Sequence, residues 1–135
     1  MPERDLAILA LRPVLDTQEA HGIEGFLHTT LRPVLKLQNP VLLALVAADI
    51  AKRIPGFVGF APEDQRQRLR DLLRKDSRLK RVLLGVVFGM LTEDELAFAL
   101  ASEAEVRRRT VALLVERVTS QTDAVVQYVA DREVG

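Results

Sequence analysis

The residues best suited to chemistry are two histidines and a glutamate near the start of the chain. His21, Glu24 and His28 are spaced by three and four positions, so on an unbroken helix they would share a face and could bind a metal ion. Gly22 and Gly25 disfavour that helix. Two histidines and one carboxylate also fall short of the glutamate-rich ligand set of a di-iron bundle. We therefore expect a cluster that is solvated or at the edge of the core, with no metal ligands and no cofactor.

A second candidate is Asp49, a carboxylate within an apolar run. It could be a buried acid, but Lys52 and Arg53 lie three and four positions later, so we expect it to face solvent. The sequence contains no serine, histidine and acid arrangement, no glycine-rich phosphate loop and no zinc-ligand spacing. It also contains no cysteine, which excludes a thiol nucleophile. We therefore predict no catalytic residue and a protein that is not an enzyme.

Length and composition indicate a single soluble domain over residues 1–135. Hydrophobic residues make up 48% of the chain, which is enough for a packed core. Nineteen basic side chains balance nineteen acidic ones, so no overall charge attracts a polyanion or an anionic membrane. The longest apolar run, Val82 to Leu91, has ten residues, whereas a membrane span needs about 20. With no cysteine and a charged first segment, we expect a cytoplasmic location and no membrane partner.

The fold class follows from residue types that favour helix. Leucine, alanine, valine, arginine and glutamate dominate, whereas the chain has five phenylalanines, one tyrosine and no tryptophan. Apolar residues recur at spacings of three and four along much of the chain. We predict an all-α fold, a compact bundle of five to seven helices with a long C-terminal helix.

Prolines and polar residues predict where these helices begin and end. Pro33 should kink or end the helix that contains it, because proline lacks the backbone donor. Asn39 followed by Pro40 has the sequence of an N-cap and a first helical residue, so another helix should begin there. A further helix should start at Pro62 and break near 76–77.

Two capping boxes predict the boundaries in the second half of the chain. The apolar run 82–91 is too short for periodicity to separate a helix from a buried strand, although its neighbours favour helix. The capping boxes that follow each have a hydroxyl and a glutamate three residues later: Thr92 with Glu95, and Ser102 with Glu105. They separate a short helix over 93–101 from a long helix that starts near 103.

One short motif occurs twice. Leu-Arg-Pro-Val-Leu at 11–15 recurs at 31–35. Two copies are too few for a solenoid, which needs at least about three units to bury its faces. The repeat therefore indicates a pair of similarly kinked helices rather than a repeat architecture.

Charge is unevenly distributed although it sums to zero. Residues 63–81 carry eight basic side chains and four acidic ones, whereas residues 82–106 carry five acidic side chains and no basic one. We expect these two segments to face each other, within one chain or between two. Exposed ion pairs contribute about 0 to 1 kcal/mol each, so their contribution would be to orientation.

An arginine triplet belongs to a segment with a familiar pattern. Residues 79–117 contain the runs LTEDELA at 91–97 and VRRR at 106–109, and they resemble the helix-turn-helix of sigma-factor region 4 and related regulators. The resemblance implies that Ala97 lets two helices cross closely and that the second helix enters the major groove. It also implies nucleic-acid contacts, to phosphates or base edges, from Arg107, Arg108 and Arg109.

The last helix carries a heptad-like apolar seam. Six residues fall on alternating spacings of three and four: Val111, Leu114, Val118, Gln121, Val125 and Tyr128. Valine at each first position with one polar residue in the seam is typical of two-stranded coiled coils, in which the polar residue fixes the register. These residues are the predicted oligomer interface of a homodimer. The alternative is a central helix buried within one chain, which has the same periodicity.

Three hypotheses about function follow, and the least favoured of them is a small-molecule or metal site in the bundle interior near His21, Glu24 and His28. The first is a non-enzymatic helical interaction or regulatory module that self-associates through its C-terminal helix and has a protein partner. The second is a DNA-binding transcriptional regulator that uses the helix-turn-helix-like segment 92–117, with the arginine triplet or the basic stretch 66–81 on phosphates. The heptad seam and the lack of catalytic patterns favour the first.

Overall fold

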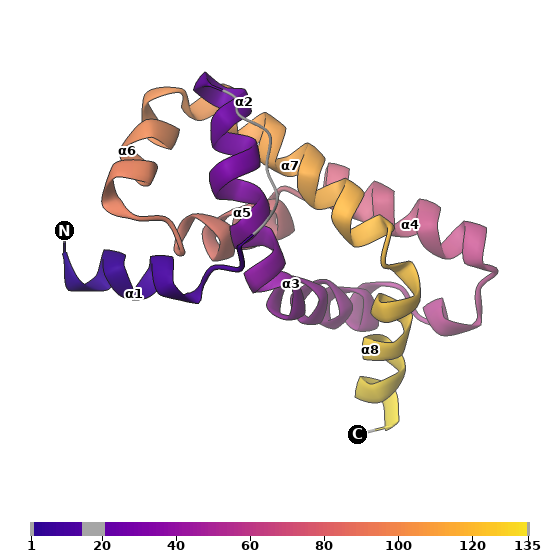
Figure 1. Cartoon of the computed structure of the whole chain (residues 1–135). Coiled ribbons are helices and arrows are strands. Elements are labelled where there is room, and N and C mark those ends of the chain that lie inside the picture. Colours follow the sequence, from indigo (N-terminus) through magenta and orange to yellow (C-terminus); the bar gives the residue numbers. More distant parts are fainter. Residues whose placement is uncertain (1, 15–20, 135) are drawn as a thin grey trace.

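A computed structural model of the chain describes residues 2–14 and 21–134, and the described residues form helices and turns without a strand (Figure 1). The predicted all-α bundle is confirmed, with seven helices when α2, the π-helical turn η1 and α3 are taken as the one continuous helix that they form. The elements are α1 (Glu3–Leu11), α2 (Gly22–Phe26), η1 (Leu27–Leu31), α3 (Arg32–Arg53), the 3₁₀ turn η2 (Phe57–Gly59), α4 (Pro62–Lys75), α5 (Ser77–Phe88), α6 (Glu93–Ala101), α7 (Glu103–Thr119) and α8 (Thr122–Val134).

The central helix runs through both of its prolines. It is continuous from Gly22 to Arg53, so the predicted helix start at Asn39–Pro40 is wrong and Pro33 does not end the helix. Pro33 is the second residue of α3 and lies just after the π-helical turn η1, in which the regular backbone bonding that proline interrupts is already changed. A proline inside a helix costs about 3 kcal/mol. Burial of apolar side chains is worth about 1.5 to 3 kcal/mol each, and α3 buries Val34, Leu35, Leu42 and Leu43 almost completely. Burial of these side chains therefore outweighs the tendency of the two prolines to end the helix.

The C-terminal segment is two helices joined by a turn. α7 ends at Thr119 and α8 begins at Thr122, with Ser120 and Gln121 between them. The hydroxyl groups of Thr119 and Ser120 donate to backbone carbonyls of the preceding turn at 2.6 and 2.7 Å, a local bond that competes with helix continuation. α8 therefore leaves the direction of α7 and packs on α3 (Figure 1).

Residues close in sequence determine where α4 ends and α5 begins. α4 ends just before Asp76, whose carboxylate accepts the Leu79 N–H at 2.7 Å as the N-cap of α5, so the predicted break near 76–77 is confirmed. The run 82–91 belongs to α5 and the turn after it, so the strand alternative is wrong.

One of the two predicted capping boxes is present. Thr92 Oγ1 accepts the Glu95 N–H at 3.2 Å, and Glu95 in return accepts the Thr92 N–H at 2.8 Å, which fixes the start of α6. Ser102, with φ −127° and ψ 44°, forms no side-chain cap. Glu105 instead accepts from Arg108 at 2.6 Å, so the second predicted box is wrong.

The helix Gly22–Arg53 is the longest helix of the described chain. Its most apolar window has a mean hydropathy of 1.5, which is enough to cross a membrane by length and composition alone. The same helix is the centre of the bundle, and 44% of that window is buried against the other helices. A core helix of this length has the same hydropathy.

Candidate functional site

The predicted oligomer seam lies partly inside the chain's own core. Three of its residues are buried: Leu114, Val118 and Val125, with 2%, 0% and 0% of their surface exposed. Three are half-buried: Val111, Gln121 and Tyr128. Because the seam passes from α7 into α8 across a turn, its ends do not lie on one straight helix, and α3 covers part of it. The chain itself covers part of this broad apolar surface, so the width of the surface does not require a second copy of the chain to cover it.

The polar residue of the seam has its partner in the same chain. The amides of Gln121 and Asn39 bond in both directions, at 2.8 Å from Asn39 Nδ2 to Gln121 Oε1 and 2.9 Å from Gln121 Nε2 to Asn39 Oδ1. Gln121 Nε2 also donates to the Arg117 carbonyl at 3.0 Å. This pair ties α3 to the turn between α7 and α8, and so fixes the register of two elements within one chain.

Exposed apolar side chains are concentrated on α1 and α6, which lie at the same end of the molecule (Figure 1). The large ones on these two helices are Leu6, Leu9, Leu11, Phe98 and Leu100, with exposures of 57%, 39%, 60%, 38% and 56%. Exposed apolar side chains mark an interaction surface where they adjoin one another. We define these five residues as the α1–α6 surface.

The sequence of α1 and α6 also predicts exposed apolar residues, although the heptad seam is the more regular apolar pattern. α1 and α6 have nine residues each and are apolar around much of their circumference, as in AILAL at 7–11 and LAFALA at 96–101. A short helix with apolar residues on several sides cannot bury them all against one neighbour. Such a helix at the edge of a bundle leaves part of its apolar surface exposed.

Buried polar contacts hold α1 against the start of α6. The Arg12 side chain, 8% exposed, donates to both carboxylate oxygens of Glu95 at 2.5 and 2.7 Å. Asp5 accepts the Glu93 N–H at 3.3 Å, at the first turn of α6. Burial raises the pKa of Glu95, but hydrogen bonds from Arg12 and the Thr92 N–H outweigh burial and bring that pKa below its ordinary value. The two helices are therefore positioned as one unit.

The helix-turn-helix-like segment does not have the geometry that the resemblance implies at Ala97. α6 and α7 are consecutive and are joined by Ser102 alone. Ala97 is exposed, although a small residue at a close helix crossing would be buried. The two helices therefore do not cross over Ala97.

The three arginines at 107–109 do not all point to the same place. Arg107 and Arg108, 46% and 68% exposed at the side chain, line a groove of about 540 Å³ between α5 and α7. Lys80 and Arg81, from the basic stretch, line the opposite wall. Arg109 instead binds Glu24 of α2, away from the groove. Two basic segments distant in sequence thus meet at one groove, and no acidic residue is among the described residues that line it.

The groove arginines also have acidic neighbours on their own helix. Glu103 lies 3.8 Å from Arg107, and Glu105 lies 2.6 Å from Arg108. These carboxylates reduce the positive charge beside the groove, and a ligand that binds Arg108 would have to compete with Glu105.

The histidine and glutamate cluster near the start of the chain does not assemble. Glu24 is the partner of Arg109, whose hydrogen bond lowers the Glu24 pKa. His28 Nε2 lies 3.7 Å from Glu24, whereas His21 precedes the helix with extended backbone. Within residues 2–14 and 21–134, no three histidine or acidic side chains are placed to hold a metal ion.

Asp49 faces the protein rather than solvent, so that prediction is wrong. Its side chain is 10% exposed and accepts hydrogen bonds from Arg53 at 3.2 Å and from Arg78 of α5. Arg53 in turn binds Asp76 at the junction of α4 and α5. Asp49 therefore joins α3 to α5 as part of a charged network, with no ligand or reacting group beside it.

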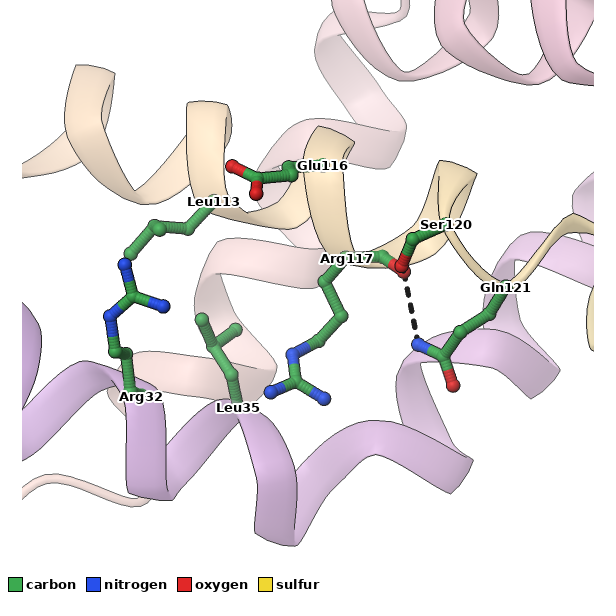
Figure 2. Close-up of a pocket in the computed structure, with 7 residues that line it drawn as sticks. All are labelled: Arg32, Leu35, Leu113, Glu116, Arg117, Ser120 and Gln121. Atoms are coloured by element: carbon green, nitrogen blue, oxygen red, sulfur yellow. Dashed lines mark hydrogen bonds between the residues drawn. The ribbon is translucent and has the colours of Figure 1, made fainter. Parts of the chain in front are cut away.

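A polar pocket of about 270 Å³ lies between α3 and α7 (Figure 2). Figure 2 shows the guanidinium groups of Arg32, from α3, and Arg117, from α7, directed into the space between the two helices with Leu35 between them. Burial lowers the pKa of Arg117, and the nearby charge of Arg32 lowers it further. Leu113, Ser120 and Gln121 also line the pocket, and the Glu116 carboxylate lies at its edge beside α7. Sequence patterns did not mark Arg32 or Arg117.

Comparisons of this chain with protein-family models, with curated proteins and with solved structures find no match. The described residues offer three candidate surfaces for function: the α1–α6 surface, the groove between α5 and α7, and the pocket between α3 and α7.

Proposed function

We propose that this protein is a non-enzymatic helical interaction module that self-associates through the α1–α6 surface. The observation that carries the proposal is the exposure of Leu6, Leu11 and Leu100, each more than half exposed, on two helices that the Arg12–Glu95 ion pair links. A prepositioned apolar surface loses little conformational entropy on binding. The proposed interface therefore lies on α1 and α6 rather than on the heptad-seam residues of α7 and α8.

A second copy of the chain is the occupant that best fits this surface. The chain has nineteen basic and nineteen acidic side chains, so two copies carry no net charge that would keep them apart. A stable dimer buries about 800 Å² on each partner, about a tenth of the 7841 Å² surface of this chain. Two short helices with five exposed apolar side chains can provide the centre of such an interface. The lack of cysteine suits a cytoplasmic setting.

Sedimentation equilibrium over a concentration series tests this proposal. The wild-type mass should rise from 15.1 kDa toward twice that value as the concentration increases. Leu100→Glu should keep the protein at 15.1 kDa, because an unpaired charge is costly to bury in an interface. Val41→Glu, at a 44% exposed position on α3, is the matched control and should associate like wild type. A wild-type mass of 15.1 kDa at every concentration would exclude self-association.

A second candidate is binding of duplex DNA through the groove between α5 and α7. The specific support is the meeting of Lys80 and Arg81 with Arg107 and Arg108 around one groove. Contacts to phosphate from such side chains give sequence-independent affinity that falls with salt. Support for base-specific recognition is weaker, because Arg109 is engaged by Glu24 and Ala97 lies on the surface.

The salt dependence of binding separates this candidate from the first. Four phosphate contacts would give a log–log slope of about −3.6, at about −0.9 for each phosphate. Arg107→Gln should reduce the slope by about 0.9. Arg132→Gln, at an exposed arginine on α8, removes the same charge far from the groove and should leave the slope unchanged. No binding to duplex DNA at low salt would reject this function and would leave self-association untouched.

A further inference from the structure

The pocket between α3 and α7 holds two cationic side chains from opposite walls. Arg32 extends from α3 and Arg117 from α7, and both line the same space of about 270 Å³ (Figure 2). Within the part of the chain that the structure describes, neither guanidinium forms an ion pair with a carboxylate. The Glu116 carboxylate lies at the edge of the pocket and is not within ion-pair distance of either guanidinium. The two like charges repel each other, and an anion between them would reduce that repulsion.

Arg117 is held in place by the amide pair that links the helices. Its Nη1 donates to Asn39 Oδ1 at 3.4 Å, and Asn39 is itself fixed by the reciprocal bonds with Gln121. Ser120 donates to the Arg117 carbonyl at 2.7 Å, which tightens the same turn. The half-buried guanidinium is therefore positioned before a ligand arrives, and its remaining N–H groups are available in the planar arrangement that oxyanions bind.

We propose that this pocket binds a phosphate group, free or as the monoester of a small molecule, between Arg32 and Arg117. The charge decides between phosphate and carboxylate. A phosphate carries about −1.5 to −2 at neutral pH, so it can neutralise two guanidinium groups, whereas a single carboxylate neutralises one. Phosphate also offers oxygens in several directions, which suits donors that approach from two facing helices.

The size and lining of the pocket suit a ligand with a small organic part. The pocket volume of about 270 Å³ exceeds the space that a single phosphate needs. Leu35 and Leu113 form an apolar part of the wall beside the two arginines. Gln121 and the Ser120 hydroxyl line the pocket as neutral polar groups. A phosphomonoester with a few carbon atoms would use both kinds of surface.

Titration calorimetry on the full chain with inorganic phosphate and with glycerol phosphate, at constant ionic strength, tests the site. Wild type should bind one phosphate group per chain. Arg117→Gln and Arg32→Gln should each weaken binding by at least about tenfold, because each removes charged hydrogen bonds. Arg117→Lys should also bind more weakly, since lysine keeps the charge and loses the planar donor pair.

Three controls test whether phosphate binding depends on Arg32 and Arg117 in particular. Arg132→Gln removes an exposed charge on α8 and should bind like wild type. Acetate should bind far more weakly than phosphate, and circular dichroism should show that each variant is folded. Because Arg32 is exposed, Arg32→Gln keeps the test valid even where Arg117→Gln does not fold. Undetectable phosphate binding by wild type, equal binding by wild type and Arg32→Gln, or equal binding of acetate and phosphate would overturn the proposal.

Discussion

Val118→Ala tests whether the heptad seam serves the chain's own core. Val118 lies in α7 with 0% of its surface exposed, and the substitution removes two methyl groups from a closed site. At about 0.8 kcal/mol for each buried carbon, the transfer loss is about 1.6 kcal/mol. The cavity left behind raises the expected loss in unfolding free energy to about 2 to 2.5 kcal/mol. For a domain of this size, the melting temperature should fall by about 6 to 9 °C.

Guanidinium unfolding followed by circular dichroism at several protein concentrations measures this loss. Since one chain alone buries the residue completely, the difference in unfolding free energy between Val118→Ala and wild type should be the same at every concentration. Val41→Ala, at a 44% exposed position, should change stability by less than about 0.5 kcal/mol. A Val118→Ala defect that appears only where the protein is associated would refute the reasoning, and so would a variant as stable as wild type.

Three further predictions concern the polar contacts that join the helices. The pKa of Glu95 is lowered in the folded state. The Glu95 carboxylate should therefore stabilise the fold fully above its ordinary pKa of 4.5 and lose that contribution as the pH falls through the lowered pKa. In acid unfolding curves, the stability difference between wild type and Glu95→Gln should shrink accordingly. Gln121→Leu should cost about 1 to 3 kcal/mol in thermal unfolding, because it leaves the Asn39 amide without its partner, and an unchanged melting temperature would contradict that role. Asp49→Ala should destabilise the protein by a similar amount and Asp49→Asn by less, as measured by chemical unfolding, whereas a solvent-facing Asp49 would make both variants neutral.

Features fixed within a few residues of sequence were predictable. The capping box of Thr92 and Glu95 and the break before Ser77 depend on side chains that bond their own backbone neighbours. The all-α class follows in the same way from helix-favouring residues along the whole chain. A local pattern is not sufficient by itself, because the similar pattern of Ser102 and Glu105 forms no capping box.

Features decided by distant partners were not predictable from local pattern. Asn39 has the sequence of an N-cap, but its side chain bonds Gln121, 82 positions later, and the helix continues past it. Asp49 has charged neighbours in the sequence, but its side chain lies against the protein and accepts a hydrogen bond from Arg78 of α5. The seam appears continuous because the turn at Ser120 leaves the spacing of apolar residues intact. Periodicity records which positions are apolar, and it does not record which element covers them.

The same limit applies to the candidate sites. The basic stretch and the arginine triplet were visible in sequence, but only the fold shows that Lys80 and Arg107 line one groove while Arg109 points elsewhere. Arg12 and Arg32 occupy the same position of the repeated Leu-Arg-Pro-Val-Leu motif. In the structure the first anchors Glu95 and the second lines the pocket between α3 and α7, so the repeat has two different structural roles.

Hydrogen–deuterium exchange at low and high protein concentration tests the central claim most directly, because it locates the interface as well as detecting it. As the concentration rises, we expect added protection of backbone amides in α1 and α6, with α8 unchanged. Leu100→Glu should abolish the added protection. Concentration-dependent protection confined to α7 and α8, or exchange that does not change with concentration in any helix, would contradict the account.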